Sequence, residues 1–463
     1  MKYDIIITGG GAAGLMAAYS AASAAAEAGM GVRICVLEKM PRPGRKIMIT
    51  GKGRCNFTNA KGWNDFSRHI RSNPRLVRAA FHTLPPEKVM GFFASYGVPS
   101  VVERGDRAFP QSYRASDIVD ALVTACTGMG VKIEGGFEVA RIAAGDIFTV
   151  SSADGRSHSC SRLIIATGGL SYPGTGSTGD GLRWAEELGH GIVPVFPSLT
   201  ALVPKGYKEY GGKGHIPRET PLSDSGRQLC GIQLKNIGLQ LIVEGTQAGE
   251  ELGDIDFTDG GIEGPVGFQL SRKAVKSMIG GSRVRLVLDL KPGVSLEQLS
   301  CRIEALWDEI STDPRSRGVR DKERCRILLG KLMPRELIPA FRDAHPEIIA
   351  TERRGGKGTA VRINLAGIAR ALKGWSFEIA GYVGWERAVI TAGGVSADSV
   401  FPKTLESRTV PGLYFCGEVL DTDADTGGYN LQLAFCTGAL SGISAAKGLR
   451  TASRPDLSSP DRK

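Results

Sequence analysis

The sequence predicts an α/β fold with a Rossmann-type parallel sheet, interrupted by an inserted β-rich α+β domain. An apolar strand at residues 3–8 leads into the glycine pattern GGGAAG at residues 9–14. An Ala-rich helix and a second apolar strand, Val32–Glu38, follow in the order of a dinucleotide-binding unit. Two later apolar segments, Leu163–Gly169 and Gly412–Asp421, have the composition of further strands of the same sheet.

The first strand, helix and second strand form a candidate dinucleotide site. Gly9 allows the tight turn, and Gly11 lets the backbone approach a pyrophosphate. Gly14 lets the helix pack closely on the strand, and the helix N-terminus presents N–H groups to the phosphates. Glu38 ends the second strand, where it would hydrogen-bond a ribose hydroxyl. The alternative is a glycine turn in an unrelated α/β unit, but the matching order of all the parts favours the nucleotide.

The cysteines and the apolar runs indicate a cytoplasmic protein. The nine cysteines are dispersed, with no CxxC pair, which fits a reducing compartment and neither a disulfide framework nor a zinc site. The six histidines occur in no HxH or HxxxH spacing, so we expect no metal site. No segment reaches about 18 uninterrupted apolar residues, so we expect no membrane span.

The net charge of +10 is compatible with two kinds of partner. A positive field attracts anionic cofactors and substrates, and it also attracts nucleic acid. Because basic residues do not dominate any one helix or tail, we expect a small-molecule substrate and no nucleic acid. The sequence does not define the oligomeric state.

The composition changes near Val193, where prolines begin to punctuate a basic, Gly-rich stretch. We expect a discontinuous cofactor-binding domain at residues 1–192 and 356–450, and an inserted substrate or cap domain at 193–355. The polar residues 451–463 are expected to form a loose C-terminal tail. Within the insert, the patterns predict strands at 229–245 and 283–290, and helices at 295–311 and 321–333.

The C-terminal segment favours FAD over NAD as the dinucleotide. The strand GLYFCGEVLD is followed by TGGYNLQLAF, which is the organisation that closes the cofactor domain of large flavoproteins. A helix beginning near Gly428 would direct its positive end at the N1–O2 edge of the flavin. There is no second Gly-x-Gly-x-x-Gly on a strand, so NAD(P)H is expected only as a transient electron donor.

Four long motifs resemble those of the HI0933-like family of flavoproteins. They are PGRKIMITGKGRCNFTN (43–59), ATGGLSYPGTGSTGDG (166–181), VITAGGVSADSV (389–400) and KTLESRTVPGLYFCGEVLDTDADTGGYNLQLAF (403–435). The resemblance covers nearly the whole chain. It implies noncovalent FAD and a two-dinucleotide-binding-domain flavoprotein fold, distantly related to fumarate reductase flavoproteins, with an inserted domain.

The resemblance also implies a set of cofactor-binding residues. The implied residues on the loop at 45–56 line the cofactor, and the backbone of Val139 contacts the adenine. The implied residues are Gly9, Gly11, Ala12, Ala13, Gly14, Glu38, Lys39, Arg45, Lys46, Cys55, Asn56, Val139, Ala166, Thr167, Gly168, Gly417, Glu418, Gly428, Asn430 and Leu431. One departure is visible: many relatives have T-H-x-G-x-S-G-P where this chain has TDGGIEGP at 258–265.

The expected function is FAD-dependent oxidoreduction. Hydride would pass between flavin N5 and an unidentified amine, ketone or enone, with O₂ as the oxidant or NAD(P)H as the reductant. Tyr172, Tyr429 and Glu418 are candidate proton donors, each with a structural alternative, so no catalytic residue is assigned. The competing interpretation is a non-catalytic or RNA-associated flavoprotein that uses FAD as a structural or redox-sensing ligand.

Overall fold

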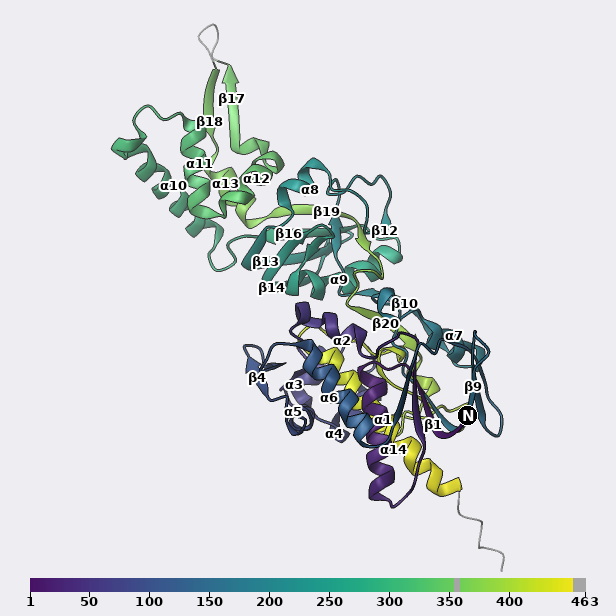
Figure 1. The fold of residues 1–463 in the computed structure, drawn as a ribbon. Helices are drawn as coiled ribbons and strands as arrows, with labels where there is room; N and C mark the ends of the chain where they lie inside the picture. The colour runs from purple at the N-terminus through teal and green to yellow at the C-terminus, as the bar shows by residue number, and fades with distance from the viewer. Residues whose placement is uncertain (354–358, 453–463) are drawn as a thin grey trace, which may run out of the picture. The chain divides into compact units, whose positions relative to one another are not determined.

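The computed structural model describes residues 1–353 and 359–452. It divides into two compact units, Met1–Pro197 with Val389–Lys463, and Ser198–Ala388 (Figure 1). The expected tail at 451–463 lies almost entirely outside the described residues.

The first unit contains the parallel sheet predicted from the sequence. The strands of the unit are β1 (Lys2–Thr8), β2 (Ile34–Glu38), β3 (Thr58–Asn59), β4 (Ser100–Glu103), β5 (Arg107–Pro110), β6 (Lys132–Gly135), β7 (Val139–Ala143), β8 (Phe148–Ser152), β9 (Ser157–Ile165), β10 (Ile192–Ser198), β20 (Ile390–Val395) and β21 (Leu413–Phe415). Of these, β3, β4 and β5 form a separate small sheet, and β10 pairs with β20. The order β6-β2-β1-β9 is continued by β8 and β7, and β21 also pairs with β9. The pairs β1–β2, β1–β9, β2–β6 and β9–β21 are all parallel. This order places the carboxyl ends of β1, β2 and β9 at one edge, where nucleotides bind in such folds.

The helices of this unit are α1 (Ala12–Glu27), α2 (Arg45–Ile49), α3 (Trp63–Phe66), α4 (Pro74–Thr83), α5 (Pro86–Ser95), α6 (Ala115–Gly128), α7 (Asp180–Glu187) and α14 (Tyr429–Ala452). Helices α1 and α14 pack closely because small residues line their contact. A Cβ built on Gly438 would lie 2.3 Å from the Ala13 carbonyl oxygen, and one on Gly442 would lie 2.1 Å from that of Ala17. The C-terminal helix is thereby fixed beside the helix that begins at the glycine turn.

The second unit is built on a mixed sheet ordered β11-β15-β14-β13-β16-β19-β12. The strands of the unit are β11 (Leu202–Pro204), β12 (Gly214–Ile216), β13 (Gln233–Val243), β14 (Thr246–Thr258), β15 (Gly261–Glu263), β16 (Val284–Asp289), β17 (Ile349–Arg353), β18 (Thr359–Ile363) and β19 (Trp375–Val383), of which β17 and β18 pair, within the described residues, only with each other. Its helices are α8 (Asp224–Leu229), α9 (Gly264–Ile279), α10 (Leu296–Thr312), α11 (Asp321–Leu332), α12 (Ile338–Ala344) and α13 (Leu365–Lys373). The strands and helices expected near 229–333 appear as β13, β16, α10 and α11.

The structure places the second boundary of the insert later than the sequence suggests. The expected insert is 193–355, whereas the second unit is Ser198–Ala388. The cause is β19, which pairs with β16, β11 and β12 and so belongs to the sheet of the insert. The sequence of β19, WSFEIAGYV, is as apolar as a strand of the first unit, so its composition does not indicate to which unit it belongs.

No helix within the described residues is long and apolar enough to cross a membrane.

Candidate cofactor site

The glycine turn between β1 and α1 has the shape that a pyrophosphate requires. Gly9 has φ +100°, and a Cβ there would lie 2.5 Å from the Ala166 carbonyl oxygen. A Cβ on Gly14 would lie 1.9 Å from the Gly9 oxygen. At Gly11, by contrast, a Cβ would meet no described heavy atom within 4 Å. Gly9 and Gly14 are therefore needed for packing, while Gly11 faces open space.

The N-terminus of α1 is open to an anion. Gly11 is its N-cap, and no side chain of the described residues accepts a hydrogen bond from the first turn, which begins with Ala12 and Ala13. Unsatisfied N–H groups and the helix dipole together favour a phosphate there.

Glu38 at the end of β2 lies against the same turn. Its two carboxylate oxygens accept hydrogen bonds from the Gly10 N–H at 2.6 Å and the Met40 N–H at 2.7 Å. Burial raises the pKa of this carboxyl above its usual value, against the opposing effect of the two N–H donors. Lys39 points elsewhere, donating to Thr178 and pairing with Asp180.

The loop that carries GKGRCNFTN follows α2. Cys55 has φ +57° and is fully buried, and burial raises the pKa of its thiol to about 12. A thiol with that pKa stays protonated at neutral pH, which argues against a reactive cysteine. The Asn56 Oδ1 atom is buried and has no hydrogen-bond partner in the described part of the chain. It lies beside Gly428, where a Cβ would come within 2.8 Å of it.

Two basic residues of α2 differ in their surroundings. Arg45 is exposed and forms no ion pair with any described residue. Lys46 Nζ lies 2.9 Å from Glu418 Oε2 and donates to Ser171 Oγ, also at 2.9 Å. Lys46 is thus partly neutralised by a protein carboxylate, and Arg45 is the cation left for an anionic ligand.

Glu418 is the centre of a network that joins distant segments. Besides Lys46, its carboxylate accepts hydrogen bonds from Ser171 Oγ at 2.5 Å and from the Thr391 N–H at 2.8 Å. Its side chain is only 11% exposed. These bonds hold the Gly417–Val419 turn against the segment that follows β9. The carboxylate is therefore engaged in structure, which weakens its candidacy as a proton donor.

The start of α14 is fixed by a second buried network. The side chain of Asp425 is 4% exposed and accepts two hydrogen bonds from Arg71. His69 Nδ1 lies 2.9 Å from the same carboxylate. The Asn430 amide bonds to the backbone of Ala424 and Asp425. The Tyr429 ring stacks on His69 with centroids 4.3 Å apart, and burial raises its pKa. Tyr429 is therefore packed and stays protonated at neutral pH.

Most of the remaining predicted residues converge on this region. Ala166 lies against Gly9, Gly168 lies near Lys46, and a Cβ on Gly417 would lie 2.7 Å from the Ala13 Cβ. Thr167 follows Ala166 beyond the end of β9, at the edge where β1 also ends. Val139 begins β7, the outer strand, just after Phe137, whose N–H bonds to the Glu38 carbonyl. Leu431 lies in the first turn of α14, half-buried.

The TDGGIEGP segment of the second unit, residues 258–265, forms an ion-pair cluster. Arg387 pairs with Asp259 and with Glu263, each at 2.6 Å. Both acids therefore contact the same arginine.

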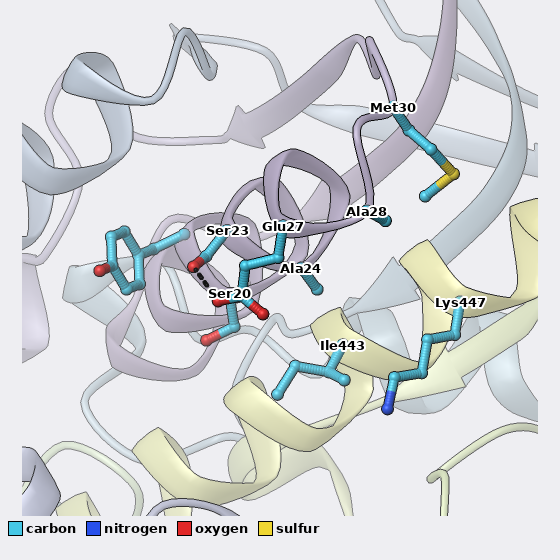
Figure 2. A pocket seen from close by; sticks show the side chains of 9 residues that line it. Ser20, Ser23, Ala24, Glu27, Ala28, Met30, Ile443 and Lys447 are labelled. Carbon is cyan, nitrogen blue, oxygen red and sulfur yellow. Dashed lines mark hydrogen bonds between the residues drawn. The ribbon is translucent and has the colours of Figure 1, made fainter.

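A hollow of about 420 Å³ lies between α1 and α14 (Figure 2). It is lined by the later part of α1, from Tyr19 to Ala28, together with Met30, Ile443 and Lys447. At 1.5 Å rise per residue, this part of α1 begins about 12 Å from Gly11. The hollow therefore lies toward the C-terminal end of α1, away from the glycine turn.

The first unit fits a flavin dinucleotide on three structural observations: the open space at Gly11, the uncapped N-terminus of α1 and the buried, unpaired Asn56 Oδ1. Fold and site together define a flavin-dependent oxidoreductase. The chain belongs to the HI0933-like family, whose Rossmann domain model matches residues 3–444.

Curated relatives span the whole chain. A 3-dehydro-bile acid delta(4,6)-reductase from Clostridium scindens is 30% identical over 442 residues, covering 95% of this chain and 98% of the relative. A ribosomal RNA dihydrouridine synthase from Escherichia coli is 28% identical, covering 94% and 96%. A protein of the same name from Haemophilus influenzae is also 28% identical, covering 96% and 98%. A quinol-fumarate reductase structure has a TM-score of 0.49 and 16% identity, covering 98% of this chain and 73% of its own.

Sequence reasoning missed the residues that support the site. Ser171 and Thr391 hold Glu418, and Arg71 and His69 hold Asp425. A usable signal was the acid-rich run DTDAD at 421–425, one residue before the glycine pair at 427–428, since buried acids require partners. Those partners lie some 350 positions away in the chain, and no local pattern indicates them.

Proposed function

We propose that this protein holds FAD noncovalently and reduces a carbon–carbon double bond conjugated to a carbonyl group. The observation that carries the cofactor part is the open, uncapped N-terminus of α1 at Gly11. The substrate class is supported by what two relatives' names have in common. A 3-dehydro-bile acid with delta(4,6) unsaturation and the uracil ring of uridine are both α,β-unsaturated carbonyl compounds.

Each residue of the site has a defined task in this proposal. The α1 N-terminus and Gly11 bind the pyrophosphate, and Glu38 accepts a hydrogen bond from a ribose hydroxyl. Asn56 provides an acceptor for an N–H of the cofactor, and the N-terminus of α14 stabilises negative charge on the ring. When bound, FAD supplies the hydride for the reduction. Because no separate nicotinamide domain is present in the sequence, NAD(P)H would bind only transiently as the reductant.

An anaerobic reduction experiment tests this function. The purified protein should show flavin absorbance, and stopped-flow mixing with NADPH or NADH should bleach it. A 3-oxo-Δ4 steroid should then restore the oxidised spectrum faster than a saturated ketosteroid of the same skeleton. If a primary amine reduces the flavin and only O₂ reoxidises it, the protein is an oxidase and the proposal is wrong.

The second candidate substrate is a uridine within RNA. It is favoured by the names of two relatives and by the concentration of basic residues in part of the second unit. Incubating the holoprotein and NADPH with an unmodified ribosomal RNA transcript should yield uridine carrying two additional hydrogens, detected by mass spectrometry of the nucleosides. Unchanged uridine, with enone reduction intact, would exclude this candidate alone.

A further inference from the structure

Contrary to the expectation that basic residues dominate no one helix, most of the net charge of this protein is concentrated in one short segment of the second unit. Residues 314–342 contain nine basic and three acidic residues, while the whole chain has a net charge of +10. The segment spans α11, the connections on either side of it and the first part of α12. Figure 1 shows these helices grouped with α10 and α13. The excess of six positive charges is therefore more than half of the total.

Many of these cations are exposed and unneutralised. Five of them form no ion pair with any described carboxylate and are all exposed: Arg317, Arg320, Lys322, Arg335 and Arg342. Arg317 and Arg320 precede α11, and Lys322 and Arg326 lie one helical turn apart on its exposed side. Arg326 is only weakly paired, 3.5 Å from Glu323. We call the set Arg317, Arg320, Lys322, Arg326 and Arg335 the α11 basic surface.

We infer that the α11 basic surface docks the phosphate backbone of a structured RNA. This inference rests on the second candidate of the proposed function, and it identifies where on the chain the RNA is held. Clustered, unpaired arginines and lysines bind phosphates with little dependence on sequence. Membrane binding requires a helix with an exposed apolar side. Among the described residues of α11, Ile327 alone is large, apolar and exposed, so the surface lacks such a side. A polyanion with fixed, closely spaced phosphates is the partner that suits it.

The role assigned to the surface is docking, not catalysis. Backbone contacts fix the position of a nucleic acid and contribute strongly salt-dependent affinity. Substituting these residues should therefore weaken RNA binding and leave the flavin and small-substrate reactions unchanged. This separation makes the inference testable independently of the reaction.

The test compares two triple variants that lose the same charge. R317Q/R320Q/K322Q removes part of the α11 basic surface, and R75Q/R78Q/K88Q removes three exposed cations from α4 and α5 of the first unit. A fluorescein-labelled ribosomal RNA hairpin with a uridine in its loop is titrated by anisotropy at 50, 100 and 200 mM KCl. Wild type should bind with a steep salt dependence. The first variant should bind at least about tenfold more weakly, with a shallower log–log salt slope by about two to three.

Three outcomes would overturn the inference: no RNA binding by wild type at 50 mM KCl, equal weakening in both variants, or equal competition by polyglutamate. Preferential binding to vesicles containing 30% phosphatidylserine would assign the surface to a membrane instead. Retained FAD and enone reduction in the first variant, with weakened RNA binding, support the inference. If the purified wild-type protein does not bind FAD, the proposed function is wrong.

Discussion

Single glycines in the nucleotide turn have different structural roles, and this difference gives a paired prediction. Gly11→Val places its side chain where a Cβ meets open space, and its φ of −82° suits any residue. We expect a folded protein with apo-state stability unchanged and FAD affinity reduced at least about tenfold, because the side chain fills the pyrophosphate position. Equilibrium dialysis of FAD and thermal unfolding of the apoprotein measure the two effects.

Gly14→Ala is the matched comparison. Its Cβ would lie 1.9 Å from the Gly9 carbonyl oxygen, so α1 must move away from β1. We expect a destabilisation of about 2 kcal/mol or more. Equal FAD loss and equal stability in both variants would contradict the distinction drawn between the two glycines.

The pairing of Lys46 with Glu418 is a second residue-scale feature with a measurable energy. Glu418 is 11% exposed, so Lys46→Met leaves a nearly buried carboxylate with only two of its three donors. We expect a loss of about 1–3 kcal/mol in the free energy of unfolding. A double-mutant cycle with Glu418→Gln should give a coupling of at least about 1 kcal/mol. The control is Lys61→Met, which breaks a pair with Asp106 and should cost under about 1 kcal/mol, because the Asp106 carboxylate is 54% exposed and stays solvated.

At the scale of elements, the N-terminus of α14 depends on a segment far away in the sequence. Arg71→Leu removes the bidentate partner of Asp425, whose side chain is 4% exposed. We expect a loss of about 3 kcal/mol, together with weaker FAD binding, because the helix start would no longer be held. Adding Asp425→Asn to Arg71→Leu should restore part of the stability, measured by urea unfolding.

Arg68→Leu serves as the comparison for that helix. Arg68 pairs with Asp65 at the surface, with side chains 78% and 66% exposed, so its loss should cost under about 1 kcal/mol. A similar loss of unfolding free energy in both variants would show that the burial of Asp425 does not determine the effect of Arg71→Leu.

The elements predicted from local pattern were located well, and those that depend on distant contacts were not. The β1-turn-α1-β2 unit, α10 and α11 follow from periodicity and from the glycine spacing, which are local properties. Membership of β19 in the insert and the partners of Asp425 arise from pairings across long stretches of chain, on which periodicity gives no information. Likewise, the sequence predicts Glu418 at the site, but its hydrogen bonds to Ser171 and Thr391 can be identified only from the folded structure.

At the scale of the whole molecule, the buried thiols predict an alkaline limit to stability. Burial raises the pKa of Cys35 and Cys325 to about 11, and that of Cys55, Cys126, Cys160 and Cys416 to about 12. An unfolded cysteine ionises near pH 8.5, so between about 8.5 and 10 the unfolded state loses protons that the folded state retains. Stability is therefore fully present below about pH 8.5 and falls as the pH rises.

The slope can be measured by urea unfolding under reducing conditions between pH 7.5 and 9.5. Each thiol that ionises only in the unfolded state contributes up to about 1.4 kcal/mol per pH unit. Cys55→Ala should reduce the slope by up to one such contribution. Cys301→Ser should leave it unchanged, because Cys301 is exposed. A stability that is flat across this range would mean that the buried thiols ionise in the folded protein.

The strands β10 and β20 pair with each other, and the second unit leaves and rejoins the first at their ends. For the first unit, the whole insert is therefore a loop whose two anchors are already neighbours. The entropic cost of closing a loop grows only with the logarithm of its length, so the size of the insert adds little to the cost of folding the flavin domain. The second unit can therefore be exchanged by recombination at two neighbouring points of the chain, with the residues of the first unit unchanged.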